Sequence, residues 1–203
     1  QIGARGTSTT LNFLQNGIGD ADTGTQAIGE SLQYLTQLQT LDLSSNAIGN
    51  AEDTGTQVIG ESLQYLTGLQ TLDLSSNWIG NAGDAGTQII GESLQYLLQL
   101  QTLDFSQNQI GGYGDIGTIV IGKSLQYLLQ LQNFDLSQNF IASGFTNITN
   151  GILYLDNLKS LYVLQVSGIS LPSSQLTRLK EFWNHRNDNT DVYVLVTIQA
   201  VQD

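Results

Sequence analysis

A nine-residue segment that recurs at nearly constant spacing is the feature that most limits how this chain can fold. "LQTLDLSSN" occurs at 38–46 and at 69–77, and it returns as "LQTLDFSQN" at 100–108 and "LQNFDLSQN" at 131–139. With Asn16, the asparagines of these segments lie at 16, 46, 77, 108 and 139, which gives steps of 30 or 31 residues. Such a period is typical of repeat architectures, in which each unit packs on its neighbours. The sequence therefore predicts a stack of similar units.

Each unit contains a strand pattern followed by a helix pattern. Apolar and polar residues alternate in "LQTLDLS" at 38–44, with Thr40, Asp42 and Ser44 predicted on the outward face of a half-buried strand. In "DTGTQVIGESLQYL" at 53–66, apolar residues recur at the spacing of an amphipathic helix. Because the outward residues of successive strands are the same, we expect the strands to lie parallel and in register, joined by helices on the far side.

The pattern L-x-x-L-x-L-x-x-N-x-I, followed by a glycine and a helix, resembles a leucine-rich repeat of the long, ribonuclease-inhibitor-like kind. Helices of that family carry G-x-x-x-L-x-x-x-L, and glycine, isoleucine and leucine recur here at the matching positions, as in Gly55, Ile59 and Leu63. The resemblance implies an α/β fold: a right-handed horseshoe with about seven parallel strands on the concave face and helices on the convex face. The loops at 49–55 and 80–86 are longer than is usual in the family.

Two sets of residues acquire structural roles in such a fold. The resemblance implies that Asn46 and its equivalents form a ladder of buried amides that satisfy backbone groups where the chain leaves each strand. Glycine inside a helix costs about 0.5–1 kcal/mol relative to alanine, so close approach between helices is the expected compensation at Gly29, Gly60, Gly91 and Gly122. Between adjacent helices, Glu92 and Lys123 are expected to form an ion pair.

The whole chain, 1–203, is predicted to be one repeat domain. Regular units of 30–31 residues occupy 1–140, and irregular repeats and a C-terminal cap occupy 141–203. The cap is expected to contain a helix at 172–183 and a last strand at 192–201. Because the chain starts at Gln1 and contains no methionine, we expect that an N-terminal cap or further domains have been removed.

Composition excludes several classes of function. Six basic against eighteen acidic residues give a net charge of -12, which disfavours nucleic acid as a partner. No apolar stretch is long enough to insert into a membrane. Without cysteine, neither disulfides nor thiolate metal sites are possible. Few lysines, abundant glutamine and asparagine, and closely similar repeats favour a secreted or cell-surface microbial protein.

No catalytic, cofactor or metal site is predicted. The one histidine, His185, has no second histidine or cysteine to accompany it, so a surface position on the cap is the preferred interpretation. No turn of the G-x-S-x-G kind supports a catalytic triad. The acidic segment "GDADTG" at 19–24 lacks the spacing of a calcium loop, and helix capping explains its carboxylates.

The candidate binding residues are carboxylates on the concave face and aromatic residues at its rim. They are Asp42, Asp73, Asp104, Asp135, Trp78, Tyr113 and Phe140. The aspartates end successive strands, and the aromatic residues stand where the repeats differ, as interface anchors do. We therefore hypothesise a monomeric, non-enzymatic protein-recognition module whose partner has a basic surface. Three alternatives remain: an acidic face kept for solubility, a structural or adhesive array, and the recognition domain of a larger protein.

Overall fold

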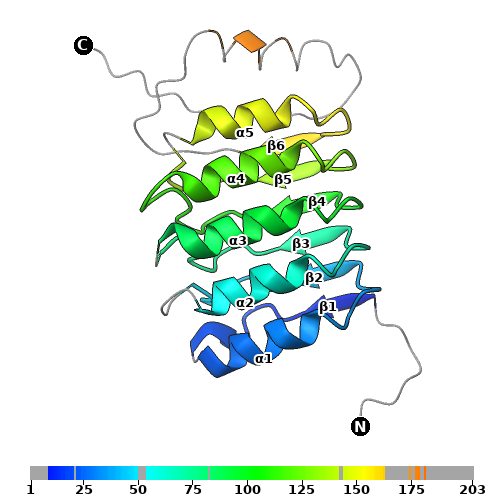
Figure 1. The fold of residues 1–203 in the computed structure, drawn as a ribbon, viewed down its shortest axis with the longest axis vertical. Helices are drawn as coiled ribbons and strands as arrows, with labels where there is room; N and C mark the ends of the chain where they lie inside the picture. The colour runs from blue at the N-terminus through cyan, green and yellow to red at the C-terminus, as the bar shows by residue number, and fades with distance from the viewer. Residues whose placement is uncertain are drawn as a thin grey trace.

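The computed structural model describes residues 9–20, 22–49, 54–81, 83–141 and 144–162, together with positions 174, 177, 178 and 181. Within them short strands alternate with helices in a stack (Figure 1). The strands are β1 (Thr10–Asn12), β2 (Thr40–Asp42), β3 (Thr71–Asp73), β4 (Thr102–Asp104), β5 (Asn133–Asp135) and β6 (Ser160–Tyr162). The helices are η1 (Ile18–Asp20), a 3-10 turn, and α1 (Asp22–Leu32), α2 (Thr54–Leu63), α3 (Asp84–Leu94), α4 (Ile116–Leu125) and α5 (Phe145–Ile152).

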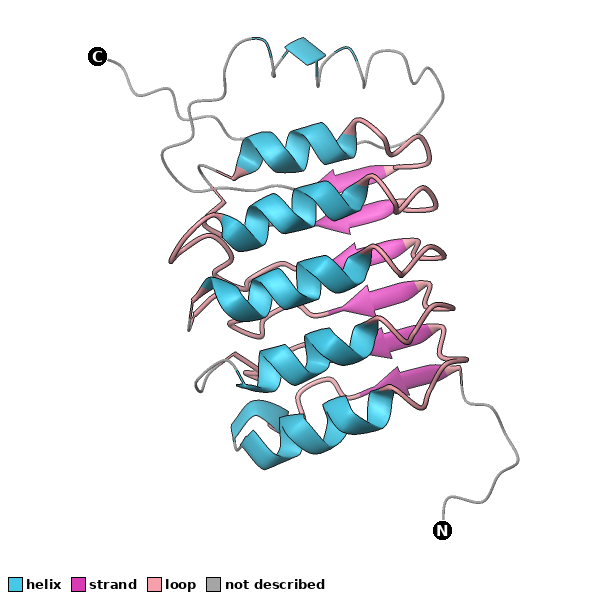
Figure 2. Cartoon of the chain, in the orientation of Figure 1, coloured by secondary structure: helices cyan, strands magenta, loops and turns pink. Residues whose placement is uncertain are grey.

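All six strands pair in parallel in one sheet, in chain order from β1 to β6. The register is the one that the repeat demands, because Leu41 of β2 lies opposite Leu72 of β3, and Leu72 opposite Leu103 of β4. Figure 2 shows the two layers, with the helices together in front of the sheet. The predicted α/β solenoid is confirmed. The strand expected at 192–201 and most of the helix expected at 172–183 lie outside the described residues.

The strands are shorter than the alternation of side chains predicted. β2 ends at Asp42, and the chain then turns through Ser45, whose φ of 56° is left-handed. Ser44 is buried, with its hydroxyl donating to the Asp42 carboxylate at 2.6 Å. This hydrogen bond keeps Ser44 on the Asp42 side of the strand, as the alternation predicts, but the residue is covered there rather than exposed. The turn that follows the strand folds this hydroxyl back onto the scaffold.

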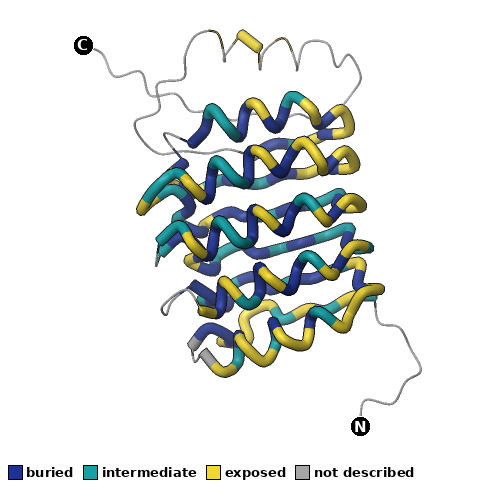
Figure 3. Tube along the Cα trace, in the orientation of Figure 1, coloured by how far each residue is buried: buried dark blue, intermediate teal, exposed yellow. Residues whose placement is uncertain are grey.

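The core lies between the two layers and runs the length of the stack. Leu41 and Leu43 from the sheet side and Ile59, Leu63 and Leu66 from the helix side are all 0% exposed. Burial of one such side chain contributes about 1.5–3 kcal/mol. Figure 3 shows this as dark buried segments on the inner side of every unit. Each unit thus needs its neighbours to complete its share of the core.

The helices approach so closely that their interior glycines have no room for a side chain. A Cβ on Gly60 would lie 2.8 Å from Cγ2 of Ile89, and one on Gly122 would overlap the backbone carbonyl of Asn147. The hydroxyl of Ser93 donates to the carbonyl oxygen of Gly60 at 2.6 Å, which ties α3 to α2. The predicted close approach is confirmed, and it offsets the cost of glycine within each helix.

Candidate functional site

A ladder of asparagine side chains fixes the chain at the end of each strand. Oδ1 of Asn77 accepts a hydrogen bond from the backbone N–H of Asn46 at 3.0 Å. Its Nδ2 donates to the carbonyl oxygens of Leu43 at 2.8 Å and Leu74 at 3.0 Å. The same pattern recurs at Asn46, Asn108 and Asn139. Because each amide joins its own unit to the one before, the strands end in register.

That register aligns one aspartate from each of four successive strands. These residues are Asp42, Asp73, Asp104 and Asp135, which we call the aspartate column, and they pair directly across the sheet. Neighbouring strands lie about 4.7–4.9 Å apart. All four side chains are half-buried. At the β1 end, Nδ2 of Asn12 donates to Oδ2 of Asp42 at 2.9 Å, so an amide continues the column.

Each carboxylate of the column is held by the turn that follows its own strand. Oδ1 of Asp73 accepts from both the backbone N–H and the hydroxyl of Ser75, at 2.9 and 2.7 Å. Oδ1 of Asp104 accepts from the backbone N–H of Ser106 at 2.8 Å. Among the described residues, no group donates to Oδ2 of Asp73 or Asp104. In both residues the scaffold therefore holds Oδ1.

Burial and charge repulsion disfavour the ionised form of the two central carboxylates, Asp73 and Asp104. Burial raises the pKa of Asp73 and of Asp104 above the ordinary value, the hydrogen bonds from Ser75 and Ser106 oppose this shift, and neighbouring aspartates add to it. Two unit charges about 4.8 Å apart repel by about 1 kcal/mol in water and by about 3 kcal/mol at an effective dielectric constant of 20. A positive charge close to the column would favour the ionised carboxylates and so oppose both the effect of burial and this repulsion.

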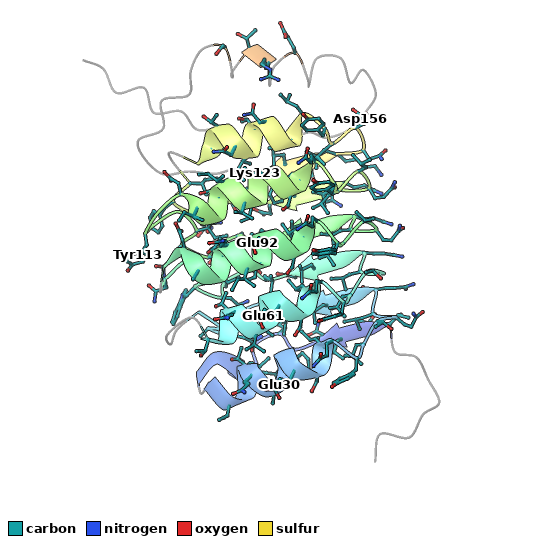
Figure 4. The ribbon with its side chains drawn as sticks, viewed as in Figure 1. Glu30, Glu61, Glu92, Tyr113, Lys123 and Asp156 are labelled. Atoms are coloured by element: carbon teal, nitrogen blue, oxygen red, sulfur yellow. The ribbon has the colours of Figure 1, made fainter. Side chains whose placement is uncertain are left out.

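The aromatic residues predicted at the rim are exposed: Trp78 by 42%, Phe140 by 58% and Tyr113 by 68%. Trp78 directly follows the ladder residue of its unit and has a left-handed φ of 59°. The Phe140 ring lies against the loop that carries Tyr113, because a Cβ on Gly112 would be 3.3 Å from its Cδ2. Figure 4 shows Tyr113 at the edge where loops enter the helices. The structure places Phe140 beside the loop that carries Tyr113, whereas Trp78 belongs to a unit two repeats before that of Phe140.

A second exposed set of residues escaped the sequence prediction. Five tyrosines, one after each helix, are between 47% and 78% exposed. They are Tyr34, Tyr65, Tyr96, Tyr127 and Tyr154, which we call the tyrosine column. The signal was present in the repeated segment "LQYL", but the tyrosine stands beside buried leucines and was not weighed as a surface residue.

Two features of the described residues bear on the chemistry of the chain. Within the part of the chain that the structure describes, no group of three or more His, Cys, Asp or Glu side chains is placed to hold a metal ion. None of the described helices has the length and apolar character needed to cross a membrane. His185, predicted at the surface of the cap, lies outside the described residues.

The parallel sheet and the helices that alternate with its strands define an α/β repeat solenoid, with the strands of successive units on one face and their helices on the other. A family model described as Leucine Rich repeat matches residues 34–51 and 65–83, which supports a leucine-rich repeat protein. Comparison with curated proteins finds no match. Leucine-rich repeats are generally protein-interaction modules and are typically not enzymes.

Proposed function

We propose that this protein is a non-enzymatic recognition module that binds a protein partner with a basic surface through its aspartate column and rim. The observation that carries the proposal is the column itself: four carboxylates in register, each held by the turn after its own strand. Helix-bearing units of 30 or 31 residues also favour the ribonuclease-inhibitor-like subtype. One fold serves many functions, so the surface of the protein carries this proposal and the fold alone does not.

The aspartate column is organised for binding before a partner arrives. Because the turn serines already hold Oδ1 of Asp73 and Asp104, binding does not have to order these side chains. Their second oxygens can accept charge-assisted hydrogen bonds from lysine or arginine. The positive charge of such a group would offset the cost of burying these carboxylates and the repulsion between them, both of which raise their pKa values.

The exposed aromatic residues of the rim supply apolar contact area in addition to the charge of the column. Exposed Trp, Tyr and Phe side chains are common anchors of protein interfaces, whereas rim charges act mainly on the rate of association. We therefore assign steering of the partner to the aspartates and its retention to Trp78, Phe140 and Tyr113. The two roles separate in binding kinetics.

The test combines Asp73→Asn with Asp104→Asn, since asparagine keeps the Oδ1 acceptor for the turn and removes the charge. Binding kinetics of a partner recovered with the wild-type protein are measured at two ionic strengths. The double variant should associate about tenfold more slowly at low salt, with a flatter salt dependence. Trp78→Ala should instead raise the dissociation rate.

A matched control removes the same charge from the helical face, with Glu61→Gln and Glu92→Gln. This variant should associate with the same partner at the wild-type rate. Equal association rates for the wild type and the aspartate variant at low salt would refute the proposal, and the column would then be an acidic face that serves solubility. A loss confined to the glutamate variant would place the interface on the helices.

A further inference from the structure

The tyrosine column lies at the edge of the stack where the helices end. Each tyrosine follows the last residue of its helix by two positions, and the backbone N–H of Tyr65 donates to the carbonyl oxygen of Ser62 at 3.2 Å. The last helical turn therefore fixes where the ring stands. Leu98 and Leu129, which follow Tyr96 and Tyr127 by two residues, are 51% and 53% exposed. Together they widen the column into an apolar patch beyond α3 and α4.

The core does not account for this exposure. Leu66, Leu97 and Leu128, the residues directly after three of these tyrosines, are 0% exposed and fill the interior of their units. The tyrosine rings leave about half of their surface in water at Tyr65 and Tyr127. Contiguous exposed apolar residues mark interaction surfaces, and tyrosine is enriched there because it joins an apolar ring to a polar hydroxyl.

A row of carboxylates accompanies the tyrosines. Glu30, Glu61 and Glu92 stand four residues before Tyr34, Tyr65 and Tyr96, and both Glu92 and Tyr96 line the cleft between α2 and α3. Figure 4 shows these glutamates in one line along the helical face.

Nothing in their own helices neutralises these glutamates. Each carboxylate accepts a hydrogen bond from a glutamine, as Glu92 does from Gln88 at 2.8 Å, but glutamine is uncharged. The last turns of α1, α2 and α3 contain no basic residue, so the negative ends of the helix dipoles add to the same edge.

The fourth position of this row carries the opposite charge, because Lys123 of α4 replaces glutamate. The ion pair expected between Glu92 and Lys123 is not formed among the described residues, and that prediction is wrong. The Glu92 carboxylate is turned to Gln88 of its own helix instead. From α1 to α4 the edge therefore presents three carboxylates and then one ammonium group, so its charge changes from negative to positive along the stack.

A cleft between α2 and α3 brings the two kinds of residue together. It has a volume of about 300 Å³, and its lining includes Glu61, Gln64, Glu92, Gln95 and Tyr96. Two carboxylates and an aromatic ring are the groups that recognise a lysine or arginine side chain, by ion pairing and by cation–π contact.

We propose that the tyrosine column and the glutamates of α1–α3 form a second docking surface, whose occupant is a basic polypeptide segment of a partner protein. One lysine or arginine of the segment enters the cleft between α2 and α3, and apolar side chains of the segment cover Tyr127 and Leu129. Charge complementarity selects this occupant, since a second copy of a chain with a net charge of -12 would be repelled.

The spacing of the helices sets the spacing of the cations. Packed helices lie about 8–10 Å apart. An extended polyproline II segment advances about 3.1 Å per residue with three residues per turn, so residues three apart match this distance and face the same way. A segment with a basic residue at every third position therefore fits the row of glutamates.

The probe is a fluorescein-labelled peptide with arginine at every third position, prolines between the arginines, and leucines at one end. Fluorescence anisotropy at two salt concentrations measures its affinity. Glu61→Gln with Glu92→Gln should weaken binding about tenfold and flatten the salt dependence. Tyr96→Ser with Tyr127→Ser should weaken binding as much and keep the salt dependence. Circular dichroism confirms that each variant is folded.

The comparison variant is Asp73→Asn with Asp104→Asn, which loses the same charge from the aspartate column. Because that column is itself proposed to accept lysine and arginine, this variant should lose some affinity for the peptide, but clearly less than Glu61→Gln with Glu92→Gln. An equal loss of affinity in this comparison variant, or no binding by the wild type at millimolar concentration, would overturn the proposal. So would a wild-type dimer in sedimentation that Tyr96→Ser with Tyr127→Ser converts to monomer, because the face would then hold a second copy.

Discussion

Replacing Asn77 by alanine tests the ladder on which both proposed surfaces depend. The Asn77 side chain is 0% exposed and joins two units. It accepts from the N–H of Asn46 at 3.0 Å and donates to the carbonyl of Leu43 in the preceding unit at 2.8 Å. It also donates to the carbonyl of Leu74 in its own unit at 3.0 Å. Alanine removes all of these bonds and leaves the backbone groups that they joined without these partners.

The magnitude follows from the groups left without a partner. An unsatisfied buried polar group costs about 1–3 kcal/mol. Counting the Asn46 N–H and one carbonyl as unsatisfied gives a loss of roughly 2–6 kcal/mol in the free energy of unfolding. Asn16 provides a matched control in the first unit, because it is exposed and its side chain donates one bond, to the carbonyl of Leu14 at 3.2 Å. Asn16→Ala should cost less than about 1 kcal/mol.

Urea denaturation followed by far-UV circular dichroism measures both variants, and their midpoints are compared with that of the wild type. Asn77→Asp adds a second check, since the carboxylate keeps an acceptor for the Asn46 N–H but faces the Leu43 and Leu74 carbonyls with no donor. It should therefore destabilise as well. Midpoints shifted equally by Asn77→Ala and Asn16→Ala would refute the argument that buried inter-unit hydrogen bonds hold the strands in register.

Two further predictions concern packing and charge. Gly122→Ala should destabilise the protein although alanine favours helices, because the new Cβ would overlap the backbone of Asn147 in α5. Gly68→Ala is the control and should be tolerated, since its Cβ would meet the nearest atoms at 3.7 Å. Thermal melts compare the two variants. Burial raises the pKa of Asp73 and Asp104 above 3.8, so the stability that they contribute is fully present below pH 3.8 and is lost as pH rises through the raised values. As pH rises through this window, the free energy of unfolding of Asp73→Asn with Asp104→Asn should therefore increase relative to that of the wild type. Urea titrations at several pH values measure this difference, and parallel curves for the two proteins would contradict the raised pKa values.

The parts of the fold that repeat could be predicted from the sequence, because repetition constrains geometry. Identical strands that follow each other at a fixed period can align in register only when parallel, and the spacing of Ile59 and Leu63 indicates a helix that returns to the same core. The ladder at Asn77 followed from the family pattern. Each of these features depends on residues that recur in every unit.

Local turn chemistry could not be predicted in the same way. Alternation places Ser44 on the Asp42 face, but it does not predict that Ser44 is covered there, next to the left-handed turn at Ser45 and hydrogen-bonded to Asp42. The choice of Gln88 over Lys123 as the neighbour of the Glu92 carboxylate depends on side-chain rotamers, which no sequence pattern encodes. The exposure of the tyrosines was missed because an apolar residue next to leucines resembles a core residue until the helix ends are known.

The equivalence of the junctions between units has an evolutionary consequence. The ladder bonds at Asn46, Asn77 and Asn108 are nearly the same, so a unit removed or duplicated by recombination between two "LQTLDLSSN" segments would leave every remaining junction intact. Such an event would shorten or lengthen the stack by one strand and one helix. Each surface would then lose or gain one aspartate, or one glutamate with its tyrosine, so that the length of partner that the protein can engage would change by a fixed increment while the fold stayed the same.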